Sequence, residues 1–192
     1  MILEMYLTLS SLILAGISNM VFTKTKLYKN HNKPIDCGKN FIDNKRLLGD
    51  NKTWIGFLSM IVFSIIFQLI ISAICNMCGL NQFNDFYNIY DNTLPLNILI
   101  GFLIGFAYMI CELPNSFLKR RINIEPGKTT KGIKGVLFFI IDQIDSLIGV
   151  VFIVYLFSGI SITKCLCYIL LGAITHIFIN VILRLLKIRK NI

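Results

Sequence analysis

Three carboxylates stand inside apolar sequence near the middle of the chain: Glu112, Asp142 and Asp145. Ionised side chains in hydrophobic segments are costly in free energy, so they are usually kept for a function. Six cationic side chains lie between Glu112 and Asp142, namely Lys119, Arg120, Arg121, Lys128, Lys131 and Lys134. A basic segment between two acidic helix ends predicts a site that holds phosphate together with a divalent cation, because each supplies charge that the other needs.

The spacing of two of these acids narrows the chemistry. Asp142 and Asp145 are three residues apart, which places them on one helix face with Cβ atoms about 5 to 6 Å apart. In a medium of low dielectric constant, two carboxylates this close cannot both stay ionised without a partner. A Mg²⁺ ion is one such partner, since it binds one or two carboxylates together with substrate phosphates. The alternatives are a protonated carboxyl group, as in a proton relay, and an ion pair with a Lys or Arg of the basic segment.

The elements that must hold these residues are predicted to be membrane helices. Of 192 residues, 55% are hydrophobic and 15% are charged, with a mean hydropathy of +0.71, which argues against a soluble domain. A helix needs about 20 residues to cross a hydrocarbon core about 30 Å thick. The sequence therefore predicts an all-α integral membrane protein, one domain over residues 1–192, with five transmembrane helices at about 2–22, 54–74, 96–117, 136–158 and 165–186. The first of these lacks a basic start and an obvious cleavage site, so we expect a retained helix.

The basic side chains predict how the helices are oriented. Of 19 Lys and Arg residues, eight lie in 24–52, six in 119–134 and four in 184–190, whereas 75–95 has none. By the positive-inside rule, loops 23–53 and 118–135 and the C-terminus are cytoplasmic, and the N-terminus is outside. We therefore expect a multi-pass protein of the cell membrane with its active site at the cytoplasmic face. This placement accounts for the net charge of +9, and we do not expect nucleic acid as a partner.

One histidine is expected at a depth in the membrane similar to that of the acids. At a rise of about 1.5 Å per residue, Glu112, Asp142 and His176 are expected in one layer just below the cytoplasmic surface. We expect His176 to be a packed polar residue rather than a ligand, because it is alone on its helix. Pro114 is expected to kink or end the third membrane helix, since proline lacks an N–H group.

The loop between the second and third membrane helices is predicted to be a surface connection without chemistry. It spans residues 76–95 and is rich in Asn and Tyr. Cys75 and Cys78 just before it form a C-x-x-C pair, but no second pair follows at ligand spacing. We expect ordinary small membrane residues there rather than a zinc site.

The second half of loop 23–53 carries more than orienting charge. Asp36, Asp43 and Asp50 recur at intervals of seven among four cationic side chains, Lys39, Lys45, Arg46 and Lys52. The spacing around Gly49 excludes a P-loop. A loop that merely orients the protein is one interpretation. An orienting loop needs no acids or glycines, however. The other interpretation is a loop that binds substrate.

Two stretches resemble a known family. The run ELPNSFLKRR (112–121), followed by DQIDS (142–146), is similar to the signature of CDP-diacylglycerol synthases, in which an acid precedes S-x-x-K-R and a later D-x-x-D closes the motif. The loop PIDCGKNFIDNKRLLGDNKTWIGF (34–57) resembles more specifically the CDP-archaeol synthases, the smaller five-helix branch of those enzymes. This loop has Asn44 and Asn51 where the archaeol-type loop usually has glycine. PGKTTKGIKG (126–135) replaces the Pro-Gly-His-Gly-Gly of the larger enzymes.

The resemblance implies a CTP-dependent cytidylyltransferase, which transfers CMP to a membrane lipid phosphate, releases pyrophosphate and requires Mg²⁺. It implies that Asp142 and Asp145 hold the metal and act in catalysis together with Lys119, with Glu112 as a further metal candidate. Substrate phosphates are expected to meet side chains from both cytoplasmic loops: Lys39, Lys45, Arg46, Asp50, Lys52, Asn115, Ser116 and Arg120.

The expected partners are CTP, a membrane lipid phosphate and the lipid bilayer. A transporter or an ion or proton pathway that uses the same acids is the alternative function. It predicts charged or broken elements near the midplane and an inverted repeat. The sequence shows neither, because the outer half of every predicted helix is nearly unbroken apolar sequence.

Overall fold

Five long apolar helices dominate the computed structural model, which describes residues 1–128 and 130–186. All five are long and apolar enough to cross a membrane: α1 (Ile2–Phe22), α3 (Trp54–Cys78), α4 (Leu94–Arg121), α5 (Gly132–Ser158) and α6 (Ile162–Leu185). A short helix, α2 (Lys26–His31), follows α1, and two 3₁₀ turns, η1 (Asn81–Phe83) and η2 (Asp85–Tyr87), connect α3 with α4. The predicted all-helical class with five membrane helices is confirmed.

The helix bounds differ in detail from those expected. Both α3 and α4 extend further at their ends, and α5 begins at Gly132. Pro114 does not end α4, which continues to Arg121 with α5 packed beside it. The basic C-terminal residues Lys187, Arg189 and Lys190 lie outside the described residues.

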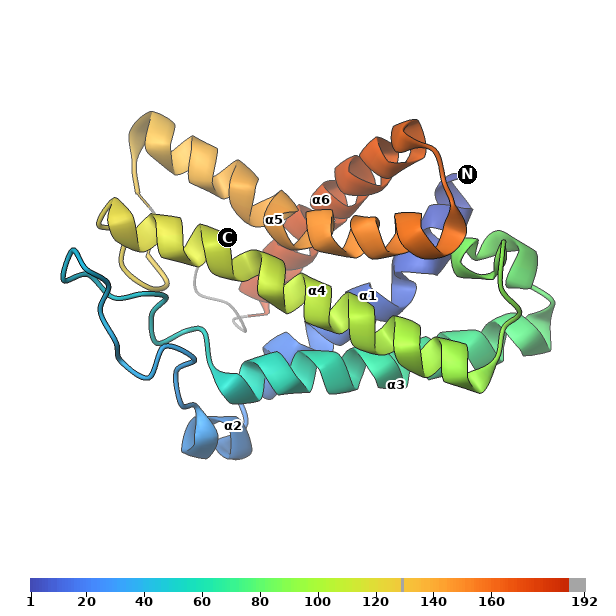
Figure 1. The fold of residues 1–192 in the computed structure, drawn as a ribbon, viewed down its shortest axis with the longest axis horizontal. Coiled ribbons are helices and arrows are strands. Elements are labelled where there is room, and N and C mark those ends of the chain that lie inside the picture. Colours follow the sequence, from blue (N-terminus) through green and yellow to red (C-terminus); the bar gives the residue numbers. More distant parts are fainter. Residues whose placement is uncertain (129, 187–192) are drawn as a thin grey trace.

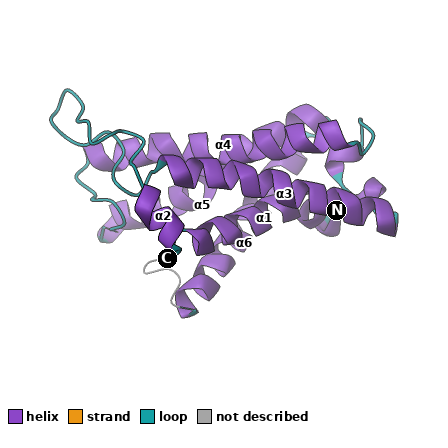
Figure 2. Ribbon diagram, turned by 90° about the horizontal axis from the view of Figure 1, so that it is seen from below, coloured by secondary structure: helices purple, strands orange, loops and turns teal. Residues whose placement is uncertain are grey.

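The connections gather at opposite ends of the bundle. Figure 1 shows residues 32–53 and the α4–α5 connection together at one end, called here the loop end. The turns η1 and η2, the N-terminus and the α5–α6 connection lie at the other, called here the turn end, and Figure 2 shows the same division from below. Within the bundle, α3 packs against α1 and α4, and α4 packs against α5.

Small residues let α4 approach both of its neighbours. A Cβ atom added at Gly101 would lie 2.6 Å from Ile65 Cα on α3, and one at Gly149 of α5 would lie 2.5 Å from Cys111 Sγ on α4. Helix backbones in membranes come this close only where side chains are small. Because Asp145 is one turn before Gly149, the contact also brings the acidic face of α5 against α4.

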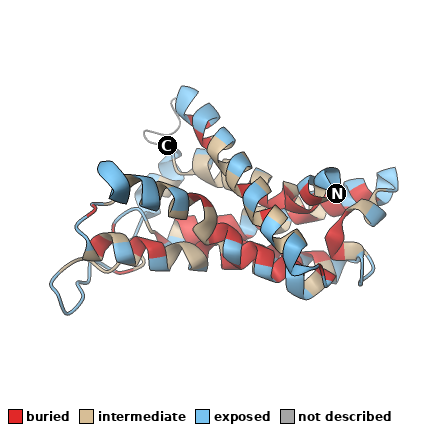
Figure 3. Ribbon diagram, turned by 90° about the horizontal axis from the view of Figure 1, so that it is seen from above, coloured by how far each residue is buried: buried red, intermediate tan, exposed pale blue. Residues whose placement is uncertain are grey.

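The last helix is the most peripheral. In the most apolar stretch of α6, 22% of residues are buried, against 33 to 39% in the other four long helices. Figure 3 shows most of its length as exposed or half-buried. It packs along α5 and touches α1 at few points. One wall of the bundle is therefore held by fewer contacts than the rest.

The segment before α3 is folded rather than extended. Thr53 caps α3, because its Oγ1 accepts a hydrogen bond from the Gly56 N–H at 3.2 Å and also bonds the Tyr28 hydroxyl at 2.8 Å. Asn44 has a positive φ of 60°, a backbone conformation that favours glycine and tolerates asparagine. This explains how asparagine stands where the archaeol-type loop usually has glycine.

Candidate active site

The two acids of α5 share a donor on α4. Asn115 Nδ2 donates to Asp142 Oδ1 and to Asp145 Oδ2, each at 2.6 Å. The backbone N–H of Ser146 donates to the other oxygen of Asp145 at 2.6 Å. The predicted spacing of three therefore does turn both carboxylates toward one neighbouring helix.

A lysine one turn after Asn115 completes this cluster. Lys119 Nζ lies 2.5 Å from both oxygens of Asp142, and it also lies over the Phe138 ring, 5.8 Å from its centre. Asn115 and Lys119 are four residues apart, so they share a face of α4. Of the interpretations left open by the sequence, this structure contains the ion pair for Asp142.

Glu112 takes a different partner. It pairs with Lys52 from the segment before α3, and both side chains are mostly buried. Their charges also act on Asp145, so the pair borders the α5 acids. Within the described residues, no three His, Cys, Asp or Glu side chains come together as a ready metal cage.

The donor set nevertheless suits a magnesium ion. Asn115 Oδ1 is buried and has no hydrogen-bond partner, and it lies on the amide group that bridges Asp142 and Asp145. Mg²⁺ binds oxygen atoms, typically with one or two carboxylates. The positions where a cation would neutralise these acids are taken by Lys119 Nζ and Asn115 Nδ2. A half-turn of the Asn115 amide would exchange Nδ2 for Oδ1.

Asp36 organises the loop that covers this end of the bundle. Its carboxylate accepts hydrogen bonds from the N–H groups of Gly38, Leu48 and Gly49, each at 3.0 Å, and from Arg46 at 2.9 and 3.2 Å. Burial opposes ionisation of Asp36, but the bonds from Arg46 and the three N–H groups outweigh it and hold the pKa of this carboxyl well below its usual range. The loop is therefore folded around one anion.

Arg121, at the end of α4, fastens the same loop to the bundle. Its guanidinium donates to Asp43 Oδ1 at 2.6 Å and to the Lys45 carbonyl at 3.1 Å. It lies between the rings of Phe41 and Phe117, at 5.2 and 4.6 Å, a favourable place for a cation. A second bond joins the same two residues, because Lys45 Nζ donates to the Arg121 carbonyl at 2.7 Å.

Arg120 is in a different situation from its neighbour. Its residue is 7% exposed, its Nε reaches the Ser116 carbonyl at 3.4 Å, and its Nη1 has no partner in the described part of the chain. The positive charge of Arg46 and, to a smaller extent, the negative charge of Glu125 also act on it. A buried cation beside a second cation favours an anion, and guanidinium groups bind phosphate well.

A cavity of about 200 Å³ lies between α1, α3, α4 and α6. Its walls are mainly apolar, and its polar lining includes Lys52, Glu112 and His176. A Cβ added at Gly16 would meet no atom within 4 Å. His176 is thus at a cavity wall, which its solitary place on α6 did not predict.

The structure brings most of the predicted site residues together. Asn115, Lys119, Asp142 and Asp145 form one cluster, called here the acidic cluster, and Arg46 lies near Arg120 above it. Asp50 is exposed and pairs with Arg46 at 2.8 Å, whereas Lys39 is exposed on the loop. Ser116 is buried beneath Arg120.

Comparisons with known proteins agree with this geometry. A family model described as CarS-like, CDP-archaeol synthase, matches residues 2–192. The CDP-archaeol synthase of Methanocaldococcus jannaschii is 30% identical over 151 residues, covering 78% of this chain and 77% of the relative. That of Methanococcus vannielii is 32% identical over 162 residues, covering 82% of both.

A solved structure shares the fold. It belongs to an intramembrane enzyme for archaeal membrane lipid biosynthesis and superposes with a TM-score of 0.64 at 20% identity, covering 94% of this chain and 95% of the other. The family model spans the helices and loops that build the acidic cluster. This chain therefore belongs to the CDP-archaeol synthase family of enzymes.

Proposed function

We propose that this enzyme transfers CMP from CTP to a membrane lipid phosphate and releases pyrophosphate. The observation that carries the proposal is the position of the acidic cluster. It lies between a folded basic loop, suited to a nucleotide, and an apolar cavity with Lys52 at its wall, suited to a lipid phosphate. The family supports the same reaction, because its members are named for a CDP-lipid product. It does not favour the transport alternative.

The bond changes are those of a phosphoryl-group displacement. An oxygen of the lipid phosphate forms a bond to the α-phosphorus of CTP, and the bond from that phosphorus to the oxygen bridging to the β-phosphate breaks. Pyrophosphate leaves with the electron pair. Such reactions depend mainly on alignment of the reacting groups and on neutralisation of negative charge.

On the nucleotide side, cations of two segments neutralise the triphosphate. Arg120 and Arg46 present guanidinium groups at the loop end, and the partnerless Nη1 of Arg120 is available to a phosphate oxygen. Lys119 now neutralises Asp142 and can turn to phosphate when another cation takes its place. Asp36 and Arg121 hold the loop in position.

Asp142 and Asp145 are the residues that would hold Mg²⁺, with the Asn115 amide oxygen beside them and Glu112 as a further candidate. When bound, the ion supplies positive charge that offsets the charge of the reacting phosphates. The residues themselves keep their positions through the close contact of α5 on α4.

On the lipid side, the cavity offers an apolar wall and a cation together. Lys52 would bind the lipid phosphate, while residues of α1 and α6 surround the chain. His176 lies at the same wall. A lipid can approach this layer sideways from the bilayer, whereas CTP approaches from water. The two substrates then meet at the acidic cluster.

The reaction is tested with purified protein in vesicles, given Mg²⁺, CTP labelled at the α-phosphorus and a panel of lipid phosphates with ether or ester tails. We expect label in a CDP-lipid and an equal amount of pyrophosphate. Asp145→Asn should lose the product and still insert into membranes. Asp91→Asn removes an exposed acid of the α3–α4 connection and should remain active. Label that stays in the nucleotide with every lipid would contradict the proposal.

The loop end is proposed to face the cytoplasm, with the N-terminus outside. Two native thiols test this, because Cys37 is exposed at the loop end and Cys78 at the turn end. A membrane-impermeant thiol reagent added to intact cells should label Cys78 and spare Cys37. Labelling of Cys37 alone would place the acidic cluster on the side away from cellular CTP.

A further inference from the structure

A second polar cluster lies at the turn end, where the sequence predicted only a surface connection. Asp85 of η2 is 3% exposed. Lys164 Nζ lies 2.8 Å from its carboxylate, and the Tyr168 hydroxyl donates to Asp85 Oδ2 at 2.6 Å. The prediction for this loop was wrong at Asp85, because a polar composition does not reveal which acid turns inward.

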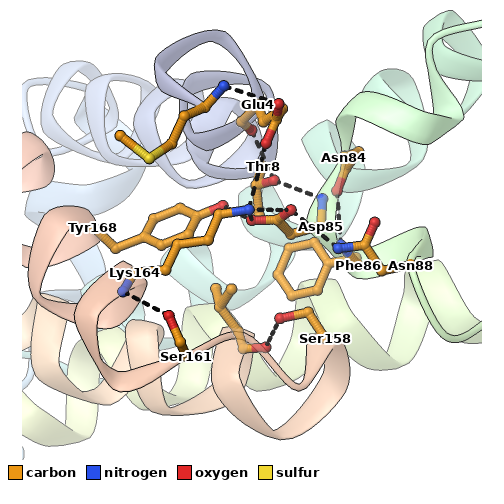
Figure 4. A network of polar contacts seen from close by, with 12 residues as sticks. Glu4, Thr8, Asn84, Asp85, Phe86, Asn88, Ser158, Ser161, Lys164 and Tyr168 are labelled. Atoms are coloured by element: carbon orange, nitrogen blue, oxygen red, sulfur yellow. Dashed lines mark hydrogen bonds and ion pairs between the residues drawn. The ribbon is translucent and has the colours of Figure 1, made fainter.

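The same carboxylate joins segments from both ends of the sequence (Figure 4). The backbone N–H of Asp85 donates to Thr8 Oγ1 of α1 at 2.9 Å, and Lys164 of α6 also reaches Glu4 of α1 at 3.4 Å. Tyr168 is fully buried. Asp85 with its two partners on α6 is called here the clasp. It ties the first turns of α6 to α1 through η2.

The helices joined by the clasp also form two facing walls of the cavity. Leu12, Gly16 and Ile17 of α1 line it, and so do His176 and Ile179 of α6. The hydroxyl of Thr175, which also lines the cavity, donates to that of Tyr6 at 3.2 Å, and few other contacts connect α1 with α6. The spacing of these walls therefore depends strongly on how the turn end is fixed.

We propose that Asp85, Lys164 and Tyr168 are positioning residues for the lipid substrate. By fixing α6 against α1, the clasp sets the width of the apolar cavity and so the fit of the lipid chain. The clasp lies at the opposite end of the bundle from the basic loop, so it touches neither CTP nor the acidic cluster. This inference rests on the proposed function, since it requires that the cavity binds the lipid.

Steady-state kinetics of the reconstituted enzyme test the proposal. For Asp85→Asn, which leaves Lys164 with only its longer contact to Glu4, we expect the KM for lipid phosphate to rise about tenfold while the KM for CTP stays within about twofold of wild type. Tyr168→Phe keeps the ring and removes one bond, so a smaller rise is expected. Lys164→Arg keeps the charge and should restore most of the lipid affinity that Lys164→Met loses.

A double variant guards against simple unfolding. Asp85→Asn with Lys164→Met removes both charges together and leaves neither buried alone, which is often tolerated. It should fold and still show the raised KM for lipid phosphate. Asp91→Asn, in the same connection but exposed, is the matched control and should behave as wild type.

Amide hydrogen exchange gives a readout besides activity. In the variants that lose the clasp, the amides of residues 169–183 should exchange faster, with those of the α4–α5 contact unchanged. Equal rises in the KM for both substrates, or an unchanged KM for lipid phosphate in folded variants, would overturn the role of the clasp. If wild-type protein made no CDP-lipid, the proposed function would fail instead, and hydrogen exchange would still report whether the clasp holds α6.

Discussion

The two ends of the bundle each hold a lysine paired with an aspartate, and the pairs are built differently. At the turn end, the Asp85 side chain is 4% exposed and accepts bonds from Lys164, Tyr168 and Asn88. At the loop end, the Asp142 side chain is 37% exposed and shares one of its two donors, Asn115 Nδ2, with a second carboxylate. A fully bonded buried anion specifies structure, whereas a cluster with exchangeable cations can accept a ligand.

Among the described residues, buried polar atoms without a partner occur at both ends, since Asn84 Nδ2 at the turn end is one of them, but at the loop end they include atoms of the proposed site. Asn115 Oδ1 and Arg120 Nη1 are buried without partners at the loop end, whereas the carboxylate of Asp85 is bonded on both oxygens. Buried polar atoms usually have partners, so each exception calls for an explanation. At the loop end the explanation would be that bound substrate and metal provide the missing partners.

Replacing an acid of the acidic cluster should have the largest effect on activity. For Asp145→Asn we expect turnover to fall about a thousandfold, because the variant removes charge that would hold the metal. The protein should still fold, since the amide oxygen can accept one of the two bonds that Asn115 Nδ2 and the Ser146 N–H donate to the carboxylate. Turnover near the wild-type rate would show that this acid is not part of the chemistry.

Replacing the acid of the clasp should instead show most clearly in stability. Asp85→Asn leaves the half-buried Lys164 with only its 3.4 Å pair to Glu4, and it weakens the acceptor of the Tyr168 hydroxyl. We expect this to lower the free energy of unfolding by about 2 kcal/mol. Thermal unfolding followed by circular dichroism measures this. If Asp85→Asn were more stable and Asp145→Asn much less so, the contrast between the two ends would be reversed.

Asp36 extends the comparison, because it is a fully bonded acid at the loop end. Its pKa lies below the ordinary value of 3.8, so its bonds stabilise the folded loop fully above about pH 4 and are lost as pH falls through the lowered folded pKa. Between pH 5 and about 8, proteolysis of loop 32–53 should therefore be independent of this group.

The matching variant removes the anion at neutral pH. Asp36→Asn should destabilise the loop by about 2 kcal/mol and speed its cleavage, with the acidic cluster left in place. Asp50→Asn is the control, because Asp50 is exposed and makes one ion pair with Arg46. Equal cleavage rates for the two variants would show that Asp36 does not organise the loop.

The sequence predicted the elements and the loop-end chemistry for physical reasons. Membrane helices must be apolar for about 20 residues, so their number could be read from composition. The spacing of Asp142 and Asp145 fixes a shared helix face, which the structure confirms through Asn115. These are local relations along one helix.

Relations between distant segments could not be predicted in this way. The contacts of Asp85 with Lys164 and Thr8 join residues 79 and 77 positions apart, respectively, and no periodicity encodes which acid turns inward. Glu112 was grouped with the α5 acids by depth and by the family resemblance, yet its partner Lys52 comes from 60 residues earlier. The cavity likewise lies between several helices, so no single segment of the sequence predicts it.

Two adjacent arginines on α4 give the comparison with the smallest expected effects on activity and stability. Arg121 donates hydrogen bonds to the loop, although its Nε is unpartnered within the described residues. Arg120 makes one hydrogen bond of 3.4 Å, within its own helix, and its Nη1 is unpartnered in the same part of the chain. Arg120→Met should weaken CTP binding about tenfold with a melting temperature close to that of wild type, because the buried guanidinium that is removed makes one long hydrogen bond and has both Arg46 and Glu125 acting on it. Arg121→Met should lower loop stability by about 1 kcal/mol. Calorimetric titration with CTP and thermal unfolding separate the two. A destabilised Arg120→Met with unchanged CTP affinity would mean that its guanidinium supports the fold and leaves the nucleotide to other cations.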